Sequence, residues 1–484
     1  MRTIKTLHEY IKDTAERTPD KYLFGDETHH ISALETLSVT EHLSARFLSC
    51  GIGAGDYVAL RANRTLFSIF ALFGLRAIGA VVVLTDPRQK PTAFLSECLL
   101  PLPVSAIVEQ TGDTAFSVSS AAGVNRFDLF ALPPSRLSLP PRDVNEPAFV
   151  IFTSGSTGEK KAVVLSESCL ICNLIDSEPL GDYSPFDVAL GALPIDHIFG
   201  LVLLCGVAVL SYALYLPKAT DVPSLLNAIE TARVTRMNGV PSLYLSMCEH
   251  AEKYDLSSLR AGFIGGSPID PQRFTGIEDT LQMTLIPVYG MSECVGIACA
   301  NSRDPREIRA NGVGRFYPMN TGAVLLGNGN EAAPYEEGEI CVKGPMRMLG
   351  YFGQPLSPDE WFRTGDLGYY DPNGGVHLTG RKKDIIIRNG NNLVPFRIEQ
   401  AFLSVPGVDA AAVVGLPDDV QGEVPAAMVV SSRDERQLLS AVSEKLAKNE
   451  LPVILKCVEA LPLTASGKPD KPRVREALMQ CRIG

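Results

Sequence analysis

The sequence predicts an α/β fold built from more than one domain. Its 484 residues exceed the size of one ordinary domain, so two or three domains are expected. Strand-like apolar runs alternate with helical patterns up to about Val313, which indicates doubly wound α/β sheets. Short β runs between turns follow, and the pattern changes again near Gly380. We therefore predict a large N-terminal domain over residues 1–380, with a β-rich subdomain at about 313–380, and a small α+β C-terminal domain over 381–484.

The individual elements follow from hydrophobic periodicity along the chain. Residues 7–15 form an amphipathic pattern that ends before Pro19, and Val39, Leu43 and Phe47 repeat every four residues, so two helices are expected first. Further helices are predicted at 65–77, at 225–231 and over Leu438 to Leu446. Strands are predicted at 57–60, 80–84, 234–238, 261–264, 285–288, 323–326, 339–343, 376–378, 410–414 and 427–430.

One uncharged stretch, residues 198–216, is long enough to cross a membrane. Two glycines interrupt it and Pro217 ends it. We therefore predict a buried helix near 200–209 followed by a strand near 212–216, and a membrane span is the weaker alternative.

Composition and charge argue against several classes of protein. The net charge is −11 and the isoelectric point is near 5.3, which disfavours a nucleic-acid partner and a polybasic membrane dock. The eleven cysteines are an odd number in a chain without a secretory signal, so we expect reduced thiols and a cytoplasmic protein. Cys169 and Cys172 form a lone CxxC without a second pair at zinc spacing, which indicates core packing.

A loop of small residues between two apolar runs is the most informative stretch. Residues 149–152 read as a buried strand, Thr153 to Gly158 follow, and residues 163–165 form a second β-rich run after Lys161. Glycines let the backbone approach a ligand, and hydroxyls with successive N–H groups can hold phosphate oxygens. The spacing excludes a Walker loop, in which the lysine precedes Ser or Thr and a helix follows. From this loop alone, an ordinary surface turn stays open as the alternative.

Six segments, in this order, resemble those of the adenylate-forming superfamily of acyl-CoA synthetases, luciferases and the adenylation domains of peptide synthetases. They are TSGSTGEKK (153–161), LPIDHIFGL (193–201), YGMSE (289–293), RTGDLGYY (363–370), GRKKDIIIRNGNNLVP (380–395) and PLTASGKPDK (462–471). Each alone is a weak signal, but together they extend over nearly the whole chain. The resemblance implies a small mobile C-terminal domain, activation of a carboxylic acid by ATP to an acyl-adenylate, and transfer of the acyl group to a thiol.

The resemblance also assigns the binding of ATP. The loop with Lys161 would hold the β- and γ-phosphates, and Tyr289 would stack on adenine against a wall formed by residues 265–267. Asp366 would accept the ribose hydroxyls, with Arg381 as a second contact. The alternative for Lys161 is an ordinary surface charge, and the alternative for Tyr289 is a core tyrosine. The alternative for Asp366 is a turn-forming residue. The ATP-binding residues so implied are Thr153, Ser154, Gly155, Ser156, Thr157, Gly158, Lys161, Gly265, Gly266, Ser267, Tyr289, Gly290, Met291, Ser292, Asp366, Arg381 and Asn392.

Four residues are implied to be catalytic. Glu293, together with Thr157, would bind Mg²⁺, because a hard cation on phosphate oxygens takes oxygen ligands. For Glu293 a charge at the start of a helix is the alternative. Lys468 would reach the substrate carboxylate and the α-phosphate. The small domain would then turn about Lys383 and bring Gly390, which would border the thiol passage, to the site.

The acid is expected to bind near His197, which resembles the pocket-mouth histidine of acyl- and aryl-CoA ligases; a structural core histidine is the equal alternative. Amino-acid-activating members carry an aspartate where this chain has Ile198, so an α-ammonium group would lack its counter-charge. Asp196 lies beside these residues and weakens that argument. We predict a fatty, aryl or other non-amino acid in a pocket lined by His197, Ile198, Gly265 and Gly290.

The acceptor thiol is expected on a separate molecule, because no carrier-protein segment follows in the sequence. Coenzyme A and the phosphopantetheine of a separate acyl carrier protein both stay open, as do a monomer and a homodimer. A non-catalytic nucleotide-binding regulator is the alternative from another class of protein. The presence of Lys468, Glu293, Asp366 and Gly390 argues against that alternative.

Overall fold

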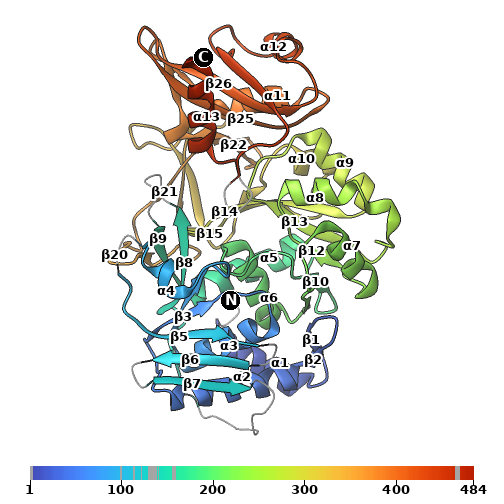
Figure 1. Ribbon diagram of the computed structural model, residues 1–484, viewed down its shortest axis with the longest axis vertical. Helices are drawn as coiled ribbons and strands as arrows, with labels where there is room; N and C mark the ends of the chain where they lie inside the picture. Colours follow the sequence, from blue (N-terminus) through green and yellow to red (C-terminus); the bar gives the residue numbers. More distant parts are fainter. Residues whose placement is uncertain are drawn as a thin grey trace.

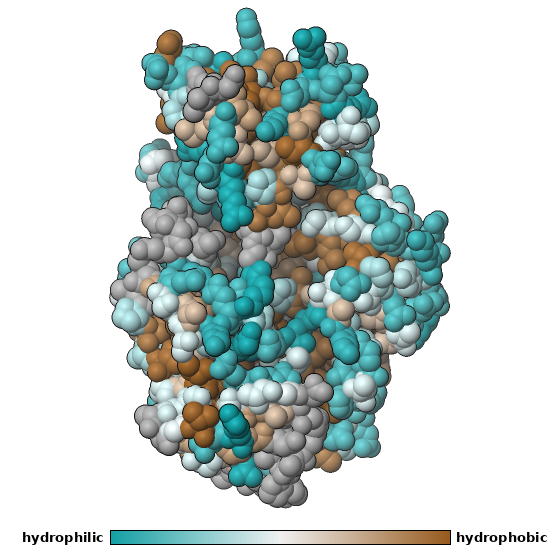
Figure 2. Space-filling view, viewed as in Figure 1, coloured by the Kyte–Doolittle hydropathy of each residue, from teal (hydrophilic) through white to brown (hydrophobic). Residues whose placement is uncertain are grey.

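The structure is a computed structural model, and it describes residues 4–98, 101–112, 115–120, 123–128, 139, 141–154, 160–463 and 469–483. Figure 1 shows a small C-terminal lobe, drawn in red, at one end of a larger body. The same face is largely hydrophilic, with exposed hydrophobic residues in several patches (Figure 2). The predicted α/β class, with a large N-terminal part and a small C-terminal part, is confirmed. The predicted boundary between residues 380 and 381 stays a prediction.

Sheet A forms the centre of one half of the large body. Its inner strands run parallel, and antiparallel strands lie at both edges. In order across the sheet they are β16 (Arg315–Phe316), β15 (Cys294–Cys299), β14 (Thr284–Met291), β13 (Ala261–Gly265), β12 (Arg236–Met237), β10 (Val188–Leu190), β11 (Ala213–Tyr215), β1 (Tyr22–Gly25) and β2 (His30–Ser32). The connecting helices between β11 and β14 are α7 (Val222–Thr231), α8 (Pro241–Cys248) and α9 (Pro271–Leu281), with a 3₁₀ turn at Ala251–Lys253.

Sheet B forms the other half of the large body and is also parallel at its centre. In order across the sheet its strands are β20 (Gln354–Pro355), β19 (Gly350–Tyr351), β9 (Lys160–Ser166), β8 (Pro147–Ser154), β4 (Val81–Thr85), β3 (Tyr57–Arg61), β5 (Val104–Gln110), β6 (Ala115–Ser120) and β7 (Gly123–Asp128). The remaining helices of the large body are α1 (Leu7–Arg17), α2 (Ala33–Ser49), α3 (Leu66–Ile78), α4 (Pro91–Leu95), α5 (Glu167–Gly181), α6 (Ile198–Leu210) and α10 (Arg306–Ala310).

Local sequence explains why the predicted helices form where they do. The predicted helix at 65–77 is α3, whose N-cap Thr65 accepts a hydrogen bond from the backbone N–H of Ser68. Every residue of α3 is buried, which explains why its sequence is apolar on all sides. The uncharged stretch 198–216 forms α6 and β11, as predicted. No helix in the described part of the chain combines the length and the apolar character needed to span a bilayer.

Two strand predictions differ from the structure. The strand predicted at 234–238 shortens to β12, because the backbone N–H of Val234 donates to the carbonyl of Ile229 and so closes α7. The antiparallel strands β5 to β7 were not predicted. Phe116 and Val118 are buried on β6, but serines and charged residues between the apolar positions give these partly exposed strands a weak pattern.

The β-rich subdomain and the small lobe complete the fold. Sheet C is antiparallel and contains β17 (Thr321–Leu325), β18 (Gly338–Lys343), β21 (Phe362–Tyr370) and β22 (Val376–Arg381). A 3₁₀ turn at Lys382–Asp384 leads into the small lobe, which comprises the described residues from 382 onward. Its strands and helices are β23 (Ile386–Arg388), β24 (Asn391–Leu393), β25 (Val408–Asp418), β26 (Gly422–Ser431), β27 (Ile454–Val458), α11 (Pro395–Leu403), α12 (Glu435–Ser443) and α13 (Lys471–Ile483).

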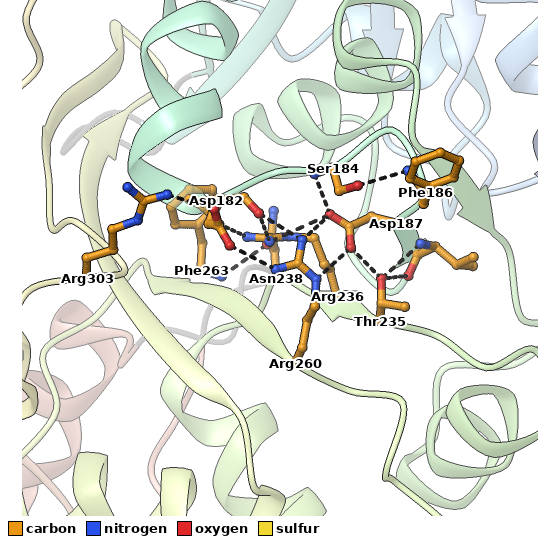
Figure 3. A network of polar contacts seen from close by, with 12 residues as sticks. Asp182, Ser184, Phe186, Asp187, Thr235, Arg236, Asn238, Arg260, Phe263 and Arg303 are labelled. Atoms are coloured by element: carbon orange, nitrogen blue, oxygen red, sulfur yellow. Dashed lines mark hydrogen bonds and ion pairs between the residues drawn. The ribbon is translucent and has the colours of Figure 1, made fainter.

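A buried polar network joins the amino ends of β10, β12 and β13 (Figure 3). The side chain of Arg236, the first residue of β12, is 1% exposed. It donates to the carbonyl oxygen of Gly181 at 2.6 Å, and its guanidinium carbon lies 4.0 Å from the ring centroid of Tyr183. Asp187 lies 3.7 Å from Arg236 and accepts from Arg260 at 2.6 Å. Burial of these charges is tolerable because each charge meets an opposite one.

Candidate active site

The segment 289–293 ends β14 and turns into β15. Met291 pairs with Cys294, so Ser292 and Glu293 form the turn of a β-hairpin. The alternative that Glu293 is a charge at the start of a helix is therefore wrong, because a strand follows it. A Cβ atom at Gly290 would lie 2.5 Å from the carbonyl oxygen of Val295, so this tight hairpin needs glycine.

Three of the predicted ATP-binding residues meet in one chain of polar contacts. The hydroxyl of Tyr289 donates to Oδ2 of Asp366 at 2.6 Å, and Nε of Arg381 lies 2.8 Å from Oδ1 of the same carboxylate. Asp366 and Arg381 are opposite each other on β21 and β22. Burial and the neighbouring carboxylate raise the pKa of Tyr289 well above its usual value, so the phenol stays a proton donor. The side chain of Asp366 is 7% exposed, whereas that of Arg381 is 48% exposed.

A second contact chain links Glu293 to the predicted phosphate loop. The hydroxyl of Tyr351, on β19, donates to Oε1 of Glu293 at 2.8 Å. Nζ of Lys161 lies 5.2 Å from the centroid of the Tyr351 ring. Burial and the Glu293 carboxylate raise the pKa of Tyr351, so this hydroxyl also remains protonated. Tyr351 was not predicted, because it belongs to no motif and reaches the site only through the pairing of β19 with β9.

The predicted phosphate loop connects strand to strand, as expected. β8 ends at Ser154, β9 begins at Lys160, and Thr153 pairs with Lys161 across the two strands. Gly155, Ser156, Thr157 and Gly158 lie outside the described residues.

The two lysines after this loop differ in their partners. Nζ of Lys160 lies 2.7 Å from Oε2 of Glu97 and 3.5 Å from the ring centroid of Phe94. Lys160 is therefore paired beside α4, whereas Lys161 lies over the ring of Tyr351, whose hydroxyl donates to Glu293. The binding of a ligand phosphate by Lys161 stays a prediction.

The glycine-rich wall lies at the carboxyl end of sheet A. Gly265 ends β13 and pairs with Val288 of β14, where a Cβ atom would lie 2.7 Å from the carbonyl oxygen of Val288. Gly266 has φ of +87°, and Ser267 is exposed after it. Ligands of open α/β sheets bind outside the carboxyl ends of parallel strands, so this wall and Tyr289 occupy the expected position.

The remaining acid-pocket residues lie at the amino end of α6. His197 is the N-cap of α6 and is partly buried, as is Ile198. The neighbouring Asp196 has its pKa raised by burial, with His197 opposing that shift. Within the described residues, no hydrogen bond joins His197 to Gly265 or Gly290, so a direct link between these pocket residues stays a prediction.

The predicted small-lobe residues Lys383, Gly390 and Asn392 lie on the turn and the hairpin at the start of the lobe. Lys383 is exposed in the 3₁₀ turn that begins the lobe, and Asn392 is exposed on β24. Gly390 has φ of +76° in the hairpin between β23 and β24, and a Cβ atom there would meet nothing within 4 Å. Lys468 lies outside the described residues.

One ion-pair cluster fixes the start of α13 beside the predicted pivot. Nζ of Lys471 lies 3.1 Å from Oδ2 of Asp384 and 3.2 Å from Oε1 of Glu399. Burial works against its charge, but Glu399 and Asp384 outweigh that and raise the pKa of Lys471. Lys471 is the last residue of the segment 462–471, and the sequence alone assigns it no role.

Comparison with known proteins decides the family. The model of the AMP-binding enzyme family matches residues 11–352, and that of the AMP-binding enzyme C-terminal domain matches residues 397–468. This chain belongs to the AMP-binding enzyme family. The predicted membership of the adenylate-forming superfamily is thereby confirmed.

Several relatives align with nearly the whole chain. A 2-succinylbenzoate–CoA ligase from Bacillus thuringiensis subsp. konkukian is 29% identical, over 96% of this chain and 97% of its own. A feruloyl-CoA synthase from Amycolatopsis sp. is 31% identical, over 88% of this chain and 90% of its own. O-succinylbenzoate coenzyme A synthetase from Bacillus subtilis, solved with ATP and magnesium ion, superposes with a TM-score of 0.82 at 23% identity. That superposition covers 97% of this chain and 99% of the other, so the two share a fold.

Proposed function

We propose that this enzyme joins a non-amino carboxylic acid to coenzyme A in two steps. The carboxylate attacks the α-phosphate of ATP and releases pyrophosphate, and the thiol then attacks the acyl carbon and releases AMP. The relatives named as CoA ligases bear out the predicted reaction class and its requirement for ATP and coenzyme A. Magnesium is supported by the ATP–magnesium complex of the B. subtilis enzyme.

The observation that carries the proposal is the meeting of two polar chains at the β14–β15 hairpin. In the first chain, the Tyr289 hydroxyl donates to Asp366, which pairs with Arg381. In the second chain, Glu293 accepts from the hydroxyl of Tyr351, and Lys161 lies over the Tyr351 ring. One end of the hairpin therefore offers a fixed carboxylate acceptor, and the other offers a carboxylate beside a cation. A nucleotide needs both, since its ribose presents a diol and its phosphates present negative charge.

The residues present fit these roles chemically. Asp366 has one carboxylate oxygen held by the Tyr289 hydroxyl and the other by Arg381, so its orientation is set before ribose binds. Glu293 supplies a carboxylate oxygen of the kind that Mg²⁺ takes when phosphates and water provide its other ligands. Bound Mg²⁺ would neutralise phosphate charge as pyrophosphate leaves, and Lys161 would attract the same phosphates. In this proposal Lys468 serves the first step.

The finer assignments are also proposals. The acid would lie between His197, Ile198 and the strand ends at Gly265 and Gly290, and its identity as fatty, aryl or other acid follows only from a substrate panel. The small lobe would turn about Lys383 between the steps. A pantetheinylated carrier protein is the alternative acceptor. A cytoplasmic location, and a monomer or homodimer, stay predictions.

The first experiment measures pyrophosphate released from ATP with benzoate, ferulate, 2-succinylbenzoate, octanoate or dodecanoate. Coenzyme A or a pantetheinylated carrier protein is then added and the thioester is identified by mass. Carboxylate-dependent pyrophosphate and AMP support the proposal, and binding of ATP without pyrophosphate release contradicts it.

Two variants test the division of labour between the steps. Lys468→Ala should lower adenylation by about 10²–10³-fold, the scale of a lost electrostatic donor, and should affect thioester formation from synthetic acyl-adenylate much less. Lys383→Pro should leave pyrophosphate exchange largely intact and abolish thioester formation. Equal losses in both steps for Lys468→Ala, or survival of both in Lys383→Pro, would contradict these roles.

A further inference from the structure

An arginine of the large body reaches across to the small lobe. Nη1 of Arg273, on α9, donates to the carbonyl oxygen of Asp409 at 2.8 Å, and Nη2 donates to the carbonyl of Val408. Its guanidinium also lies 3.8 Å from the carboxylate of Asp409. In Figure 1, α9 lies at the edge of the large body that faces the red lobe. This contact joins residues 135 positions apart and crosses between the two parts of the molecule.

Both sides of this contact are shaped by local structure. Asp270 caps α9 and accepts from the backbone N–H groups of Gln272 and Arg273, which fixes the start of the helix. On the other side, the register of β25 against β26 shifts between Val408 and Ala410. Such a bulge takes the intervening residue out of the regular ladder, so its carbonyl is free to accept from outside the sheet. The side chain of Arg273 is 24% exposed, which protects the contact from full solvent screening.

Its position relative to the pivot decides what the contact can do. The ion pair of Arg381 with Asp366 lies on the large-body side of Lys383 and can persist while the small lobe turns. The contact of Arg273 with β25 lies beyond Lys383, so it must break in any substantial rotation about that residue. In the orientation that this contact fixes, a Cβ atom at Gly390 would meet nothing within 4 Å, so Gly390 itself is not packed against the large body.

We propose that Arg273 is a positioning residue that holds the small lobe in its adenylating orientation and releases it for thiol transfer. The inference rests on the proposed two-step function. Arg273 makes charge-assisted hydrogen bonds to backbone carbonyls of the small lobe and contacts no substrate. Replacing it therefore lowers the population of the adenylating orientation.

Arg306 provides a matched control on the same side of the large body. Its guanidinium lies 2.8 Å from Asp279 and 3.0 Å from Glu278, and it also donates to the carbonyl of Thr275. Like Arg273 it binds a carbonyl and a carboxylate, and its side chain is 34% exposed. Its partners among the described residues lie on α9 in the large body, so its removal deletes contacts of the same helix but no contact between the lobes.

The test compares Arg273→Ala, Arg273→Lys and Arg306→Ala in the two half-reactions. Adenylation is followed by ATP–pyrophosphate exchange with whichever of the five acids gives the most exchange in the unchanged protein. Transfer is followed as thioester formation from the synthetic adenylate of that acid and coenzyme A. Arg273→Ala should lower adenylation by about tenfold and leave transfer unchanged or faster, because charged hydrogen bonds of this kind contribute on that scale.

Further outcomes separate this proposal from its alternatives. Arg273→Lys should recover part of the adenylation, since lysine keeps the charge but cannot donate to both carbonyls in the same way. Arg306→Ala should leave the ratio of the two rates unchanged. Equal losses in both half-reactions for Arg273→Ala, or the same change of ratio in Arg306→Ala, would overturn the proposal. If the unchanged protein shows no exchange with any acid, the proposed function itself is wrong.

Discussion

Charged residues lie at both ends of sheet A, but they differ in exposure: one set lies at the amino ends of its strands, and the other lies on sheet C beside Tyr289 at the carboxyl end of β14. At the amino ends of the strands, Arg236 is 1% exposed and Asp187 is 2% exposed, and the guanidinium packs on Tyr183. At the carboxyl end, Asp366 is buried but its partner Arg381 is 48% exposed. In the first set the two opposite charges Arg236 and Asp187 are both buried, whereas in the second one partner is exposed to solvent.

This difference teaches how to tell a structural ion pair from one that can bind a ligand. Both sets are close pairs in the fold, so proximity alone does not separate them. What separates them is whether a partner faces solvent near the carboxyl ends of the parallel strands of sheet A, where ligands of such sheets bind; Arg381 does, because Asp366 accepts from Tyr289 there. The comparison predicts that changes at the amino ends affect stability, and that changes at the carboxyl ends affect catalysis.

The largest effect is expected for Arg236→Met. The change leaves the carbonyl groups of Gly181 and Asp182 without this donor and removes the positive charge 3.7 Å from Asp187. Loss of one member of a buried charged network costs about 3–5 kcal/mol of unfolding free energy. We expect a lower urea midpoint for the first unfolding transition and unchanged specific activity of the folded protein. Arg233→Met is the control, because the pair of Arg233 with Asp255 is exposed and contributes at most about 1 kcal/mol. If Arg236→Met loses activity but keeps its stability, the assignment of the amino-end residues to stability is wrong.

A second structural position makes the stability of the protein depend on pH. His8 lies on α1, its Nδ1 has no hydrogen-bond partner among the described residues, and burial together with Arg142 lowers its pKa to about 4. Between pH 6.5 and about 4 the unfolded chain therefore binds the extra proton, so stability falls as the pH decreases through this window. Above it neither state is protonated and the contribution vanishes.

His8→Gln should remove this dependence, which amounts to about 3 kcal/mol at the acid end of the window. Melting temperatures of the two proteins should converge near neutral pH and diverge toward pH 4, with the variant the more stable there. Parallel melting curves at all pH values would show that His8 is not buried as a neutral group.

At the carboxyl end, Asp366→Asn should lower adenylation efficiency by about 10–100-fold, because a carboxylate accepts stronger hydrogen bonds than an amide. Asparagine still accepts from Tyr289, so the melting temperature should change little. Asp371→Asn is the control, since Asp371 pairs with His377 in the same subdomain. If Asp366→Asn lowers the melting temperature strongly but leaves pyrophosphate exchange normal, Asp366 stabilises the fold and does not serve catalysis.

The smallest effect is expected for Tyr351→Phe, which removes the hydroxyl that holds Glu293. One neutral donor is worth about 0.5–1.5 kcal/mol, so we expect a few-fold increase in the Mg²⁺ concentration needed for half-maximal pyrophosphate exchange. Tyr370→Phe is the control, because the Tyr370 hydroxyl donates to the carbonyl of Ala332 away from the site. If both variants need the same Mg²⁺ concentration for half-maximal exchange, the Tyr351 hydroxyl has no effect on metal binding and this prediction is wrong.

Much of the site could be predicted because its parts are short segments whose backbone chemistry shows in the sequence. Gly290 is needed where a Cβ would meet Val295, and Gly266 where φ is positive. Such requirements are local, and they recur in order along the chain. The same holds for α3 and α6, whose uniformly apolar sequences match their burial.

The rest could not be predicted because it depends on contacts between distant segments. Tyr351 meets Glu293 only because β19 pairs with β9, and Arg273 meets Val408 only through the position of the small lobe. The different contacts of Lys160 and Lys161 likewise depend on Glu97, more than sixty residues earlier in the chain. Sequence spacing carries no signal for any of these contacts.

The most direct test of the account is the fate of ATP when the purified protein is incubated with Mg²⁺ and each acid of the panel. The account predicts AMP and pyrophosphate that appear only with a carboxylate, followed by a thioester when coenzyme A is added. Cleavage of ATP to ADP alone, or pyrophosphate release that ignores the acid, would contradict it.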